Sequence, residues 1–466
     1  MKKSICIMLI VCFMAIILMP VETFAGENPL VVIQIENPKA LINTKIVDIE
    51  QNSSQIKPVL INNTTMVPLR FCVEMLGANV SWNQETKTAQ ITADNTNVRV
   101  TIGSKIVTVG DAKVTLESAP LTLYNRTFVP VRVISEALGY DVIWDNVDKT
   151  IFIGKDLAGV NQHQLISNLG DAYFKYVNLN RSKEEQILYF AKRYSPEGYY
   201  ILSQSKNFMN WFRTGDFLRN LPTAVHEECH AYSMLSYLKG GARQSRFYLG
   251  DGKTVAVKHT DVFKTKEMAS TIPQDLRTFR FDTYIGNADD YLAANSLGVY
   301  GLLDEFTAYY YGTRTACELY DYYMTLDQTP DNWFDYISNV SGQYFAHAEF
   351  RFYILKYLMY AKQNYPNIYK DIMANKEFKQ VFNTIDVKFA QIIDEFFNKK
   401  QQIAALLDRI GYEAYERNGR FEIVKRDGST TLTRSINTGS YDEQYFRLME
   451  EMGKPEYQAL IRELKS

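Results

Sequence analysis

The sequence predicts an α+β protein in which two copies of a small β/α module precede a mostly α-helical region with a small sheet. Three observations predict this fold class. An internal repeat in one fixed register fills the first third of the chain. Apolar residues three or four apart dominate after Leu165, and Asp-Gly turns mark hairpins inside that helical region. A chain of 466 residues is expected to hold two or three domains.

The first 25 residues have the layout of a signal peptide. Lys2 and Lys3 precede an apolar run that ends at Pro20, and small residues stand at the −3 and −1 positions of a cleavage site after Ala25. An uncleaved membrane anchor is the alternative. We expect cleavage near Ala25 and a bacterial protein that is secreted or associated with the cell surface. We expect no transmembrane segment after cleavage, because no second long apolar run follows.

Charge and cysteine content restrict the partners and the source of stability. The net charge of −2 provides no general basic field, so we expect no nucleic-acid partner. Cleavage would leave Cys72, Cys229 and Cys317, an odd and sparse set that does not form a disulfide framework. Stability must therefore come from packing. The sequence leaves the oligomeric state open.

The repeat lies within residues 30–154 and predicts a duplicated domain. Four short blocks recur after a constant spacing of 62 residues, and in the first copy they are 67–70, 74–77, 80–83 and 87–89. Each copy reads as a strand, a Pro turn, a short helix closed by Leu-Gly, a strand carrying Trp, and a last strand. We expect Trp82 and Trp144 to face inward and to anchor the core of each copy.

These repeated blocks resemble the copper amine oxidase N-terminal-like domain, also called the stalk domain, of secreted bacterial proteins. The resemblance implies a surface-display or adhesive module. It does not imply oxidase chemistry, because a copper amine oxidase needs three His ligands, two of them as His-x-His, and a Tyr within Asn-Tyr-Asp/Glu. The chain contains neither pattern.

Residues 165–466 read as a second, α-rich domain. The apolar periodicity predicts helices near 165–180, 183–195, 222–239, 300–325, 333–363, 366–397, 399–416 and 440–464. A hairpin is expected with strands near 244–249 and 254–259 around Asp251-Gly252, and another near 421–434 around Asp427-Gly428.

One motif in this second domain predicts metal chemistry. His226-Glu227-Glu228-Cys229-His230 is an H-E-x-x-H sequence. Its helix is expected to begin near Pro222 and to end at Gly240-Gly241. Residues four apart lie on one helical face, so both imidazoles reach one zinc ion. Glu227 projects beside the metal, where it can act as the catalytic base toward a zinc-bound water.

Zinc needs a third protein ligand, and Glu305 is the expected one. It lies in Asp304-Glu305-Phe306-Thr307-Ala308, where the small Ala308 shares a face with Glu305 and lets this helix lie close to the metal helix. Asp304 reads equally well as a helix cap or as a group that orients a ligand His. The two blocks resemble the gluzincin class of zinc metallopeptidases, in which a Glu-x-x-Ala helix supplies the third ligand. The resemblance implies a zincin-like domain.

Hydrolysis of a peptide bond by the zinc-bound water forms a tetrahedral oxyanion, which needs a further hydrogen-bond donor besides zinc. Five tyrosines precede or follow Glu305 in the sequence, and the sequence does not choose among them: Tyr284, Tyr300, Tyr309, Tyr310 and Tyr311.

The main expectation is a secreted zinc metallopeptidase that acts on a peptide or protein substrate or on a component of the cell envelope. One alternative is a non-catalytic envelope-binding or adhesive protein with a vestigial or structural metal site. A zinc amidase of cell-wall peptides is a third option, since it uses the same chemistry on a different amide.

Overall fold

The computed structural model describes residues 28–93, 96–179, 181–240, 243–417, 420–426, 432–436 and 439–466. The expected signal peptide lies outside these residues. The chain forms two compact units. The first runs to Val160 and includes Asp171–Val177, and the second comprises Asn161–Gly170 and Asn178–Ser466. The first unit is rich in strands and the second is mostly helical, which confirms the predicted α+β class.

The first unit contains the duplicated module. Its elements are β1 Val31–Gln34, β2 Lys39–Ile42, β3 Lys45–Asp48, β4 Val59–Ile61, β5 Thr64–Pro68, α1 Leu69–Met75, β6 Asn79–Asn83, β7 Thr88–Ala93, β8 Thr96–Thr101, β9 Ile106–Val109, β10 Ala112–Thr115, β11 Leu121–Leu123, β12 Arg126–Pro130, α2 Val131–Ala137, β13 Asp141–Asp145, β14 Thr150–Gly154 and α4 Asp171–Val177. Gly77 and Gly139 follow α1 and α2 with φ of 76° and 80°, a conformation that suits glycine as a helix terminator.

The two copies meet where β5 pairs with β12. Val67 lies opposite Val129, and these residues are 62 positions apart, so equivalent residues of the two copies face each other. Strands β6 to β10 form one five-stranded sheet in sequence order. The matching sheet has the order β13-β14-β1-β2-β3, in which β14 pairs with β1. This sheet therefore combines β13 and β14 from the end of the second copy with β1, β2 and β3 from the start of the domain.

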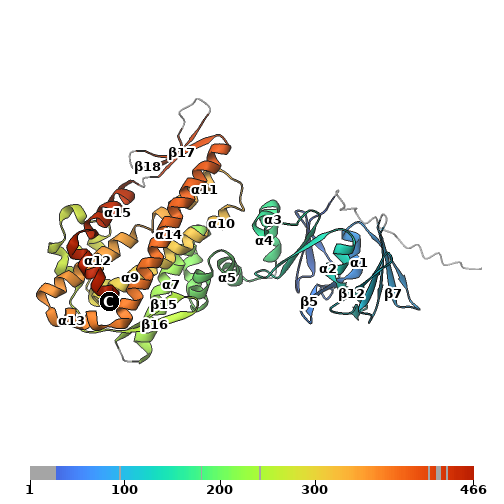
Figure 1. The fold of residues 1–466 in the computed structure, drawn as a ribbon, viewed down its shortest axis with the longest axis horizontal. Helices are drawn as coiled ribbons and strands as arrows, with labels where there is room; N and C mark the ends of the chain where they lie inside the picture. The colour runs from blue at the N-terminus through green and yellow to red at the C-terminus, as the bar shows by residue number, and fades with distance from the viewer. Residues whose placement is uncertain are drawn as a thin grey trace, which may run out of the picture. The chain divides into compact units, whose positions relative to one another are not determined.

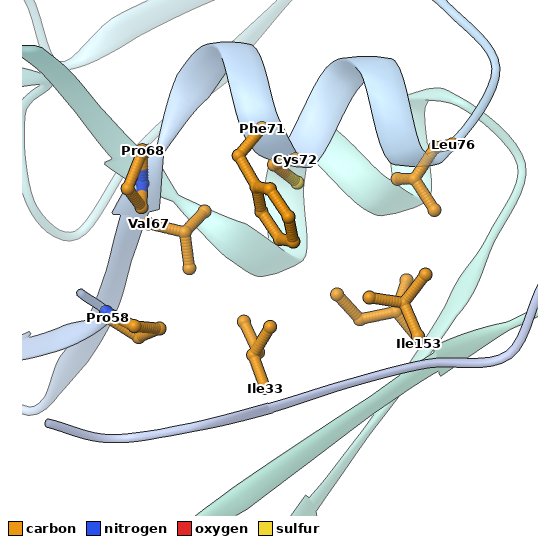
Figure 2. Close-up of a pocket in the computed structure, with 9 residues that line it drawn as sticks. Ile33, Pro58, Val67, Pro68, Phe71, Cys72, Leu76 and Ile153 are labelled. Carbon is orange, nitrogen blue, oxygen red and sulfur yellow. The ribbon is translucent and has the colours of Figure 1, made fainter. Parts of the chain in front are cut away.

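One part of the core of the first unit lies between α1 and the sheet that contains β1. Figure 2 shows Phe71, Cys72 and Leu76 of α1 pointing toward Ile33 of β1 and Ile153 of β14, around a small apolar hollow. Burial raises the pKa of the Cys72 thiol to about 12, so this cysteine stays protonated. None of the residues that line this hollow is charged, so their contribution is apolar packing.

The expectation that both Trp side chains anchor the core is wrong for Trp82. Trp82 is 42% exposed, and its indole donates a hydrogen bond to Gln84 on the surface. Four of the five residues of its strand β6 are exposed, so little of the domain covers this strand. Trp144 packs against the core and is half-buried.

The second unit surrounds the candidate site. Its helices are α3 Gln162–Leu169, α5 Lys183–Tyr194, α6 Pro196–Ser203, α7 Phe217–Gly240, α8 Ala293–Ser296, α9 Val299–Glu318, α10 Tyr320–Tyr323, α11 Pro330–Ser341, α12 Ala346–Asn364, α13 Pro366–Ala374, α14 Lys376–Arg409, α15 Gly439–Met452 and α16 Pro455–Lys465. Short helical turns span Phe208–Phe212, Thr265–Thr271, Gln274–Leu276 and Asp282–Gly286. Strands β15 Gln244–Gly250 and β16 Lys253–Lys258 form a hairpin, and β17 Tyr412–Arg417, β18 Arg420–Lys425 and β19 Leu432–Ile436 form a three-stranded sheet.

Several expected helices are divided in the structure. The helix expected over 165–180 breaks at Gly170, which has φ of 52°. The helix expected over 366–397 breaks at Asn375, because its side chain accepts a hydrogen bond from the Phe378 amide and caps α14. The helix expected over 399–416 is wrong in its last part, where β17 occupies Tyr412–Arg417. The second expected hairpin is present as β18 and β19, and its Asp427-Gly428 turn lies outside the described residues.

Helix α9 lies at the centre of the second unit and contacts α7, α12 and α14 (Figure 1). The approach of α9 to α7 is close because small residues line the contact. A Cβ added at Gly312 would lie 3.2 Å from the Pro222 carbonyl oxygen and 3.3 Å from the Cβ of His226. Gly312 thus continues the face of Ala308 that the sequence indicates.

The helix that carries the H-E-x-x-H motif begins earlier than expected. It begins at Phe217, so Pro222 lies inside α7 and not in its first turn. A proline inside a helix leaves the carbonyl four residues earlier without its backbone donor. In α7 this carbonyl belongs to Leu218, and the side-chain amide of Asn339 in α11 donates to it at 3.0 Å. This contact explains how the helix tolerates Pro222.

Among the described residues, no helix has the length and apolar character needed to cross a membrane. Cys72, Cys229 and Cys317 are buried free thiols.

Candidate metal centre

The two histidines of the motif lie side by side on α7. The Nε2 atoms of His226 and His230 are 3.2 Å apart, and the ring planes are nearly perpendicular. This arrangement follows from the four-residue spacing, which places both side chains on one helical face. Both rings are largely but not fully buried.

Glu305 of α9 faces the two histidine rings. Its Oε2 lies 3.5 Å from Nε2 of His230 and 3.9 Å from Nε2 of His226. One ligand atom from each of the three residues lies within 4.8 Å of the others. The structure therefore brings together His226, His230 and Glu305, although 75 positions separate the last two in the sequence.

The donor set and its spacing fit a zinc ion. Zinc–nitrogen and zinc–oxygen bonds are about 2.0–2.1 Å long, so ligand atoms in a tetrahedral site lie about 3.3–3.4 Å apart. The distances of 3.2, 3.5 and 3.9 Å are close to the edges of such a tetrahedron. The Oε2 atom of Glu305 is buried and accepts no hydrogen bond from the described residues. Such a carboxylate oxygen is costly without a partner, and a cation would supply one.

Neighbouring groups hold both imidazoles in place. The Nδ1 atom of His230 lies 2.8 Å from Oδ2 of Asp304, and Ser233 donates to the other oxygen of this carboxylate. The backbone at Ala308 forms a hydrogen bond with His226. Asp304 lies inside α9, so of its two sequence interpretations the structure favours orientation of a ligand His over helix capping. Each ring thus directs Nε2 toward Glu305.

Burial and charge move the pKa values of the two histidines in opposite directions. Burial, followed by the charges of His230 and Arg280, lowers the pKa of His226 well below its ordinary value. Burial also acts to lower the pKa of His230, but Asp304 and Glu305 outweigh it and raise that pKa well above its ordinary value. A cation bound by both Nε2 atoms would compete with the binding of a proton at His230, since a metal-bound imidazole nitrogen carries no proton.

Glu227 lies next to this cluster and is half-buried. Burial raises the pKa of its carboxyl, Glu305 and Glu228 raise it further, and His230 acts in the opposite direction. The adjacent Glu228 is buried, and its carboxylate accepts a hydrogen bond from the Trp211 indole at 2.9 Å. Of the two neighbouring carboxylates, Glu228 is thus bonded to Trp211, whereas Glu227 is the one whose pKa responds to the charges of His230 and Glu305.

The structure separates the five tyrosines that the sequence leaves equivalent. The ring of Tyr309 lies 4.3 Å from that of His226 between centroids, and the hydroxyl of Tyr284 lies 3.4 Å from that of Tyr309. The others bond elsewhere, Tyr300 with Thr260, Tyr310 with Arg314 and Tyr311 with the Tyr248 carbonyl. Two tyrosines therefore lie near the candidate metal centre.

Sequence reasoning missed Arg280 and Glu349. Arg280 donates from Nε to the Tyr309 hydroxyl at 3.1 Å and from Nη1 to Glu349 at 2.6 Å. Neither residue belongs to a recognisable motif, and they lie on separate segments. Glu349 does carry one signal, since a glutamate between Ala348 and Phe350 in a helix rich in apolar and aromatic residues is expected to need a partner.

Comparison with known proteins identifies one part of the chain. Residues 46–153 match the family of the copper amine oxidase N-terminal domain. This region is a copper amine oxidase N-terminal-like domain, as its repeats predict.

A curated relative is a protein named "Protease inhibitor" from Brevibacillus choshinensis. It is 32% identical over 98 residues, which are 21% of this chain, and the chain spans only 30% of the relative's length. No solved structure matches the chain significantly.

Proposed function

We propose that the second unit is a zinc-dependent hydrolase of peptide bonds, of the gluzincin type, in which His226, His230 and Glu305 hold the metal. The observation that carries the proposal is the convergence of these three side chains around the buried Oε2 of Glu305, which has no hydrogen-bond partner among the described residues. Three protein ligands leave one position open for water or substrate, which distinguishes a catalytic site from a structural one.

Bound zinc would supply a Lewis acid and would lower the pKa of a coordinated water toward neutrality. Glu227 accepts the proton of the attacking water as the water oxygen bonds to the peptide carbonyl carbon. The same carboxyl then returns this proton to the amine nitrogen as the carbon–nitrogen bond breaks. A pKa raised by burial suits both steps, because Glu227 must take up a proton and release it again.

The signal-peptide layout and the N-terminal domain support a location outside the cell or at its surface. We propose that the copper amine oxidase N-terminal-like domain displays or anchors the hydrolase, and that the substrate is a peptide or protein, including peptides of the cell envelope.

The test is peptide cleavage by zinc-loaded protein and by two matched variants. Glu227→Gln should lower cleavage of a peptide library by about 10²–10⁴-fold and leave one equivalent of zinc bound. Glu228→Gln, at the adjacent buried carboxylate, should retain activity because an amide oxygen also accepts from Trp211. Zinc binding without any cleavage by the unmodified protein would support a non-catalytic binding protein. Cleavage restricted to purified cell-wall peptides would support an amidase.

A further inference from the structure

We propose that Tyr309 donates a hydrogen bond to the substrate carbonyl oxygen as this oxygen gains negative charge, and that Arg280 is the positioning residue that directs the Tyr309 hydroxyl. This inference rests on the proposed function and assigns two further residues to the same site.

The position of Tyr309 follows from its spacing on α9. It lies four residues after Glu305, so both side chains project from one helical face. Its ring meets the His226 ring at an interplanar angle of 70° with centroids 4.3 Å apart. Tyr309 is half-buried, whereas Tyr300, Tyr310 and Tyr311 on the same helix are buried among other partners.

The hydrogen bond from Arg280 restricts the direction of the O–H bond of Tyr309. The guanidinium Nε–H donates to the Tyr309 oxygen at 3.1 Å. A guanidinium group has no acceptor, so the phenolic proton must be directed away from Arg280. The hydroxyl of Tyr284 is the other neighbour of the Tyr309 hydroxyl, at 3.4 Å, a distance too long for a strong bond between hydroxyls. The Tyr309 proton is therefore available to an incoming acceptor.

Arg280 is itself fixed on its other edges. Its Nη1 donates to Oε2 of Glu349 at 2.6 Å, and its Nη2 donates to the Gly342 carbonyl at 3.0 Å. Glu349 is fully buried, and Thr278 also bonds to its carboxylate. Three hydrogen bonds in different directions fix the orientation of the Arg280 guanidinium, and the fixed guanidinium in turn fixes the position of the Tyr309 hydroxyl.

Such an arrangement is useful because a donor already in place needs no reorganisation when charge develops on the substrate. The positive charge of Arg280 next to the phenolic oxygen also strengthens the O–H as a donor. The competing interpretation is that Arg280 and Tyr309 only support packing between α9 and α12. That interpretation predicts loss of stability without a specific loss of catalysis.

The experiment compares Tyr309→Phe with Tyr300→Phe in the full chain loaded with zinc. Both variants remove one hydroxyl from α9, but the Tyr300 hydroxyl bonds to Thr260. Tyr309→Phe should lower kcat by about 10²–10³-fold, change KM by less than about threefold, and keep one equivalent of zinc. Tyr300→Phe should retain the kcat of the unmodified protein. Melting temperatures of both variants report on folding.

A second measurement does not depend on turnover. A phosphinic dipeptide carries a tetrahedral anionic group that mimics the charged carbonyl, and calorimetry measures its affinity for the zinc-loaded protein. Tyr309→Phe should weaken this affinity about 10–100-fold, since a hydrogen bond to a charged group is lost. Tyr300→Phe should leave it unchanged.

Arg280→Lys and Arg314→Lys form the matched pair for the positioning role. Arg314 also lies near a glutamate and a tyrosine, with Glu318 at 2.8 Å and the Tyr310 hydroxyl at 2.8 Å. Lysine keeps the charge but lacks the planar guanidinium group, whose N–H groups hold several partners in fixed directions. Arg280→Lys should lower kcat by about 10²-fold and weaken phosphinic dipeptide binding, whereas Arg314→Lys should change neither.

The outcomes separate this inference from the proposed function. If the unmodified protein cleaves peptides and Tyr309→Phe matches Tyr300→Phe in kcat and in phosphinic dipeptide affinity, the inference is overturned and the hydrolase stands. If the unmodified protein cleaves no peptide, the proposed function fails. Equal phosphinic dipeptide affinities for the two tyrosine variants would then overturn the inference as well.

Discussion

The Oδ2 atom of Asp304 lies 2.8 Å from Nδ1 of His230, so the residue next to the proposed ligand Glu305 holds the ring of another proposed ligand. Adjacent residues of a helix point about 100° apart. Helix α9 therefore presents Glu305 to the two histidine rings and Asp304 to the Nδ1 side of the His230 ring. A single helix thus carries both a proposed ligand and the group that would orient a second one, so the proposed metal centre depends on the packing of α9 on α7.

The first prediction concerns this orienting contact. Asp304→Asn should keep the shape of the side chain but remove the charge that favours the required tautomer of His230. We expect zinc affinity to fall about 10–100-fold, as measured by competition with a chromogenic chelator. Asp321→Asn changes an exposed carboxylate on α10 and should not alter affinity. Equal affinities for the two variants would contradict the orienting role.

The second prediction concerns Pro222 and Asn339. Asn339→Ala removes the donor to the Leu218 carbonyl, so the free energy of unfolding should fall by about 1–2 kcal/mol. In a Pro222→Ala background the backbone N–H of residue 222 can donate to the Leu218 carbonyl, so Asn339→Ala should lower the free energy of unfolding much less. Urea unfolding of the unmodified protein, the two single variants and the double variant measures this coupling. Additive effects would show that the contact does not compensate for the proline.

The third prediction uses Asp442 in α15. Burial raises the pKa of this carboxyl from 3.8 to about 6, although Lys400 lies 3.7 Å away. Between about pH 6 and pH 4 this carboxyl binds a proton in the folded protein but not in the unfolded chain. The free energy of unfolding therefore increases as the pH falls through this window and decreases as the pH rises through it.

The stability of the unmodified protein relative to Asp442→Asn should therefore increase by up to about 3 kcal/mol between about pH 7 and pH 4. Urea unfolding across this range measures the difference. The opposite slope would mean that the ion pair with Lys400 dominates, which contradicts the assigned effect of burial. Asp321→Asn, at an exposed carboxylate, should show no such dependence.

How far the sequence predicts the fold depends on whether a feature is local. The repeat spacing predicts the duplication and the elements of each copy. It does not show that β14 of the second copy pairs with β1 at the start of the domain, since that pairing joins residues far apart in the sequence. Helix breaks were less predictable, because the apolar periodicity continues across Gly170 while the backbone there takes φ of 52°. Trp82 was placed in the core because the sequence of a strand does not show how much of the strand the rest of the domain covers.

The same distinction applies to the candidate site. Helical spacing alone brings His226 and His230 together, and the Glu-x-x-Ala pattern indicates Glu305. Tyr309 also carries a local signal, because it is four residues after Glu305. Arg280 carries none, since its link to Tyr309 depends on how the segment that contains Arg280 packs between α9 and α12.

Zinc stoichiometry of the purified chain, measured by elemental analysis for the unmodified protein, Glu305→Ala and Glu318→Ala, tests the central claim most directly. Glu318 is a second glutamate of α9, paired with Arg314 away from the histidines. We predict one equivalent of zinc for the unmodified protein and for Glu318→Ala, and strongly reduced zinc for Glu305→Ala. A full equivalent of zinc in Glu305→Ala, or none in the unmodified protein, would contradict a metal centre built from His226, His230 and Glu305.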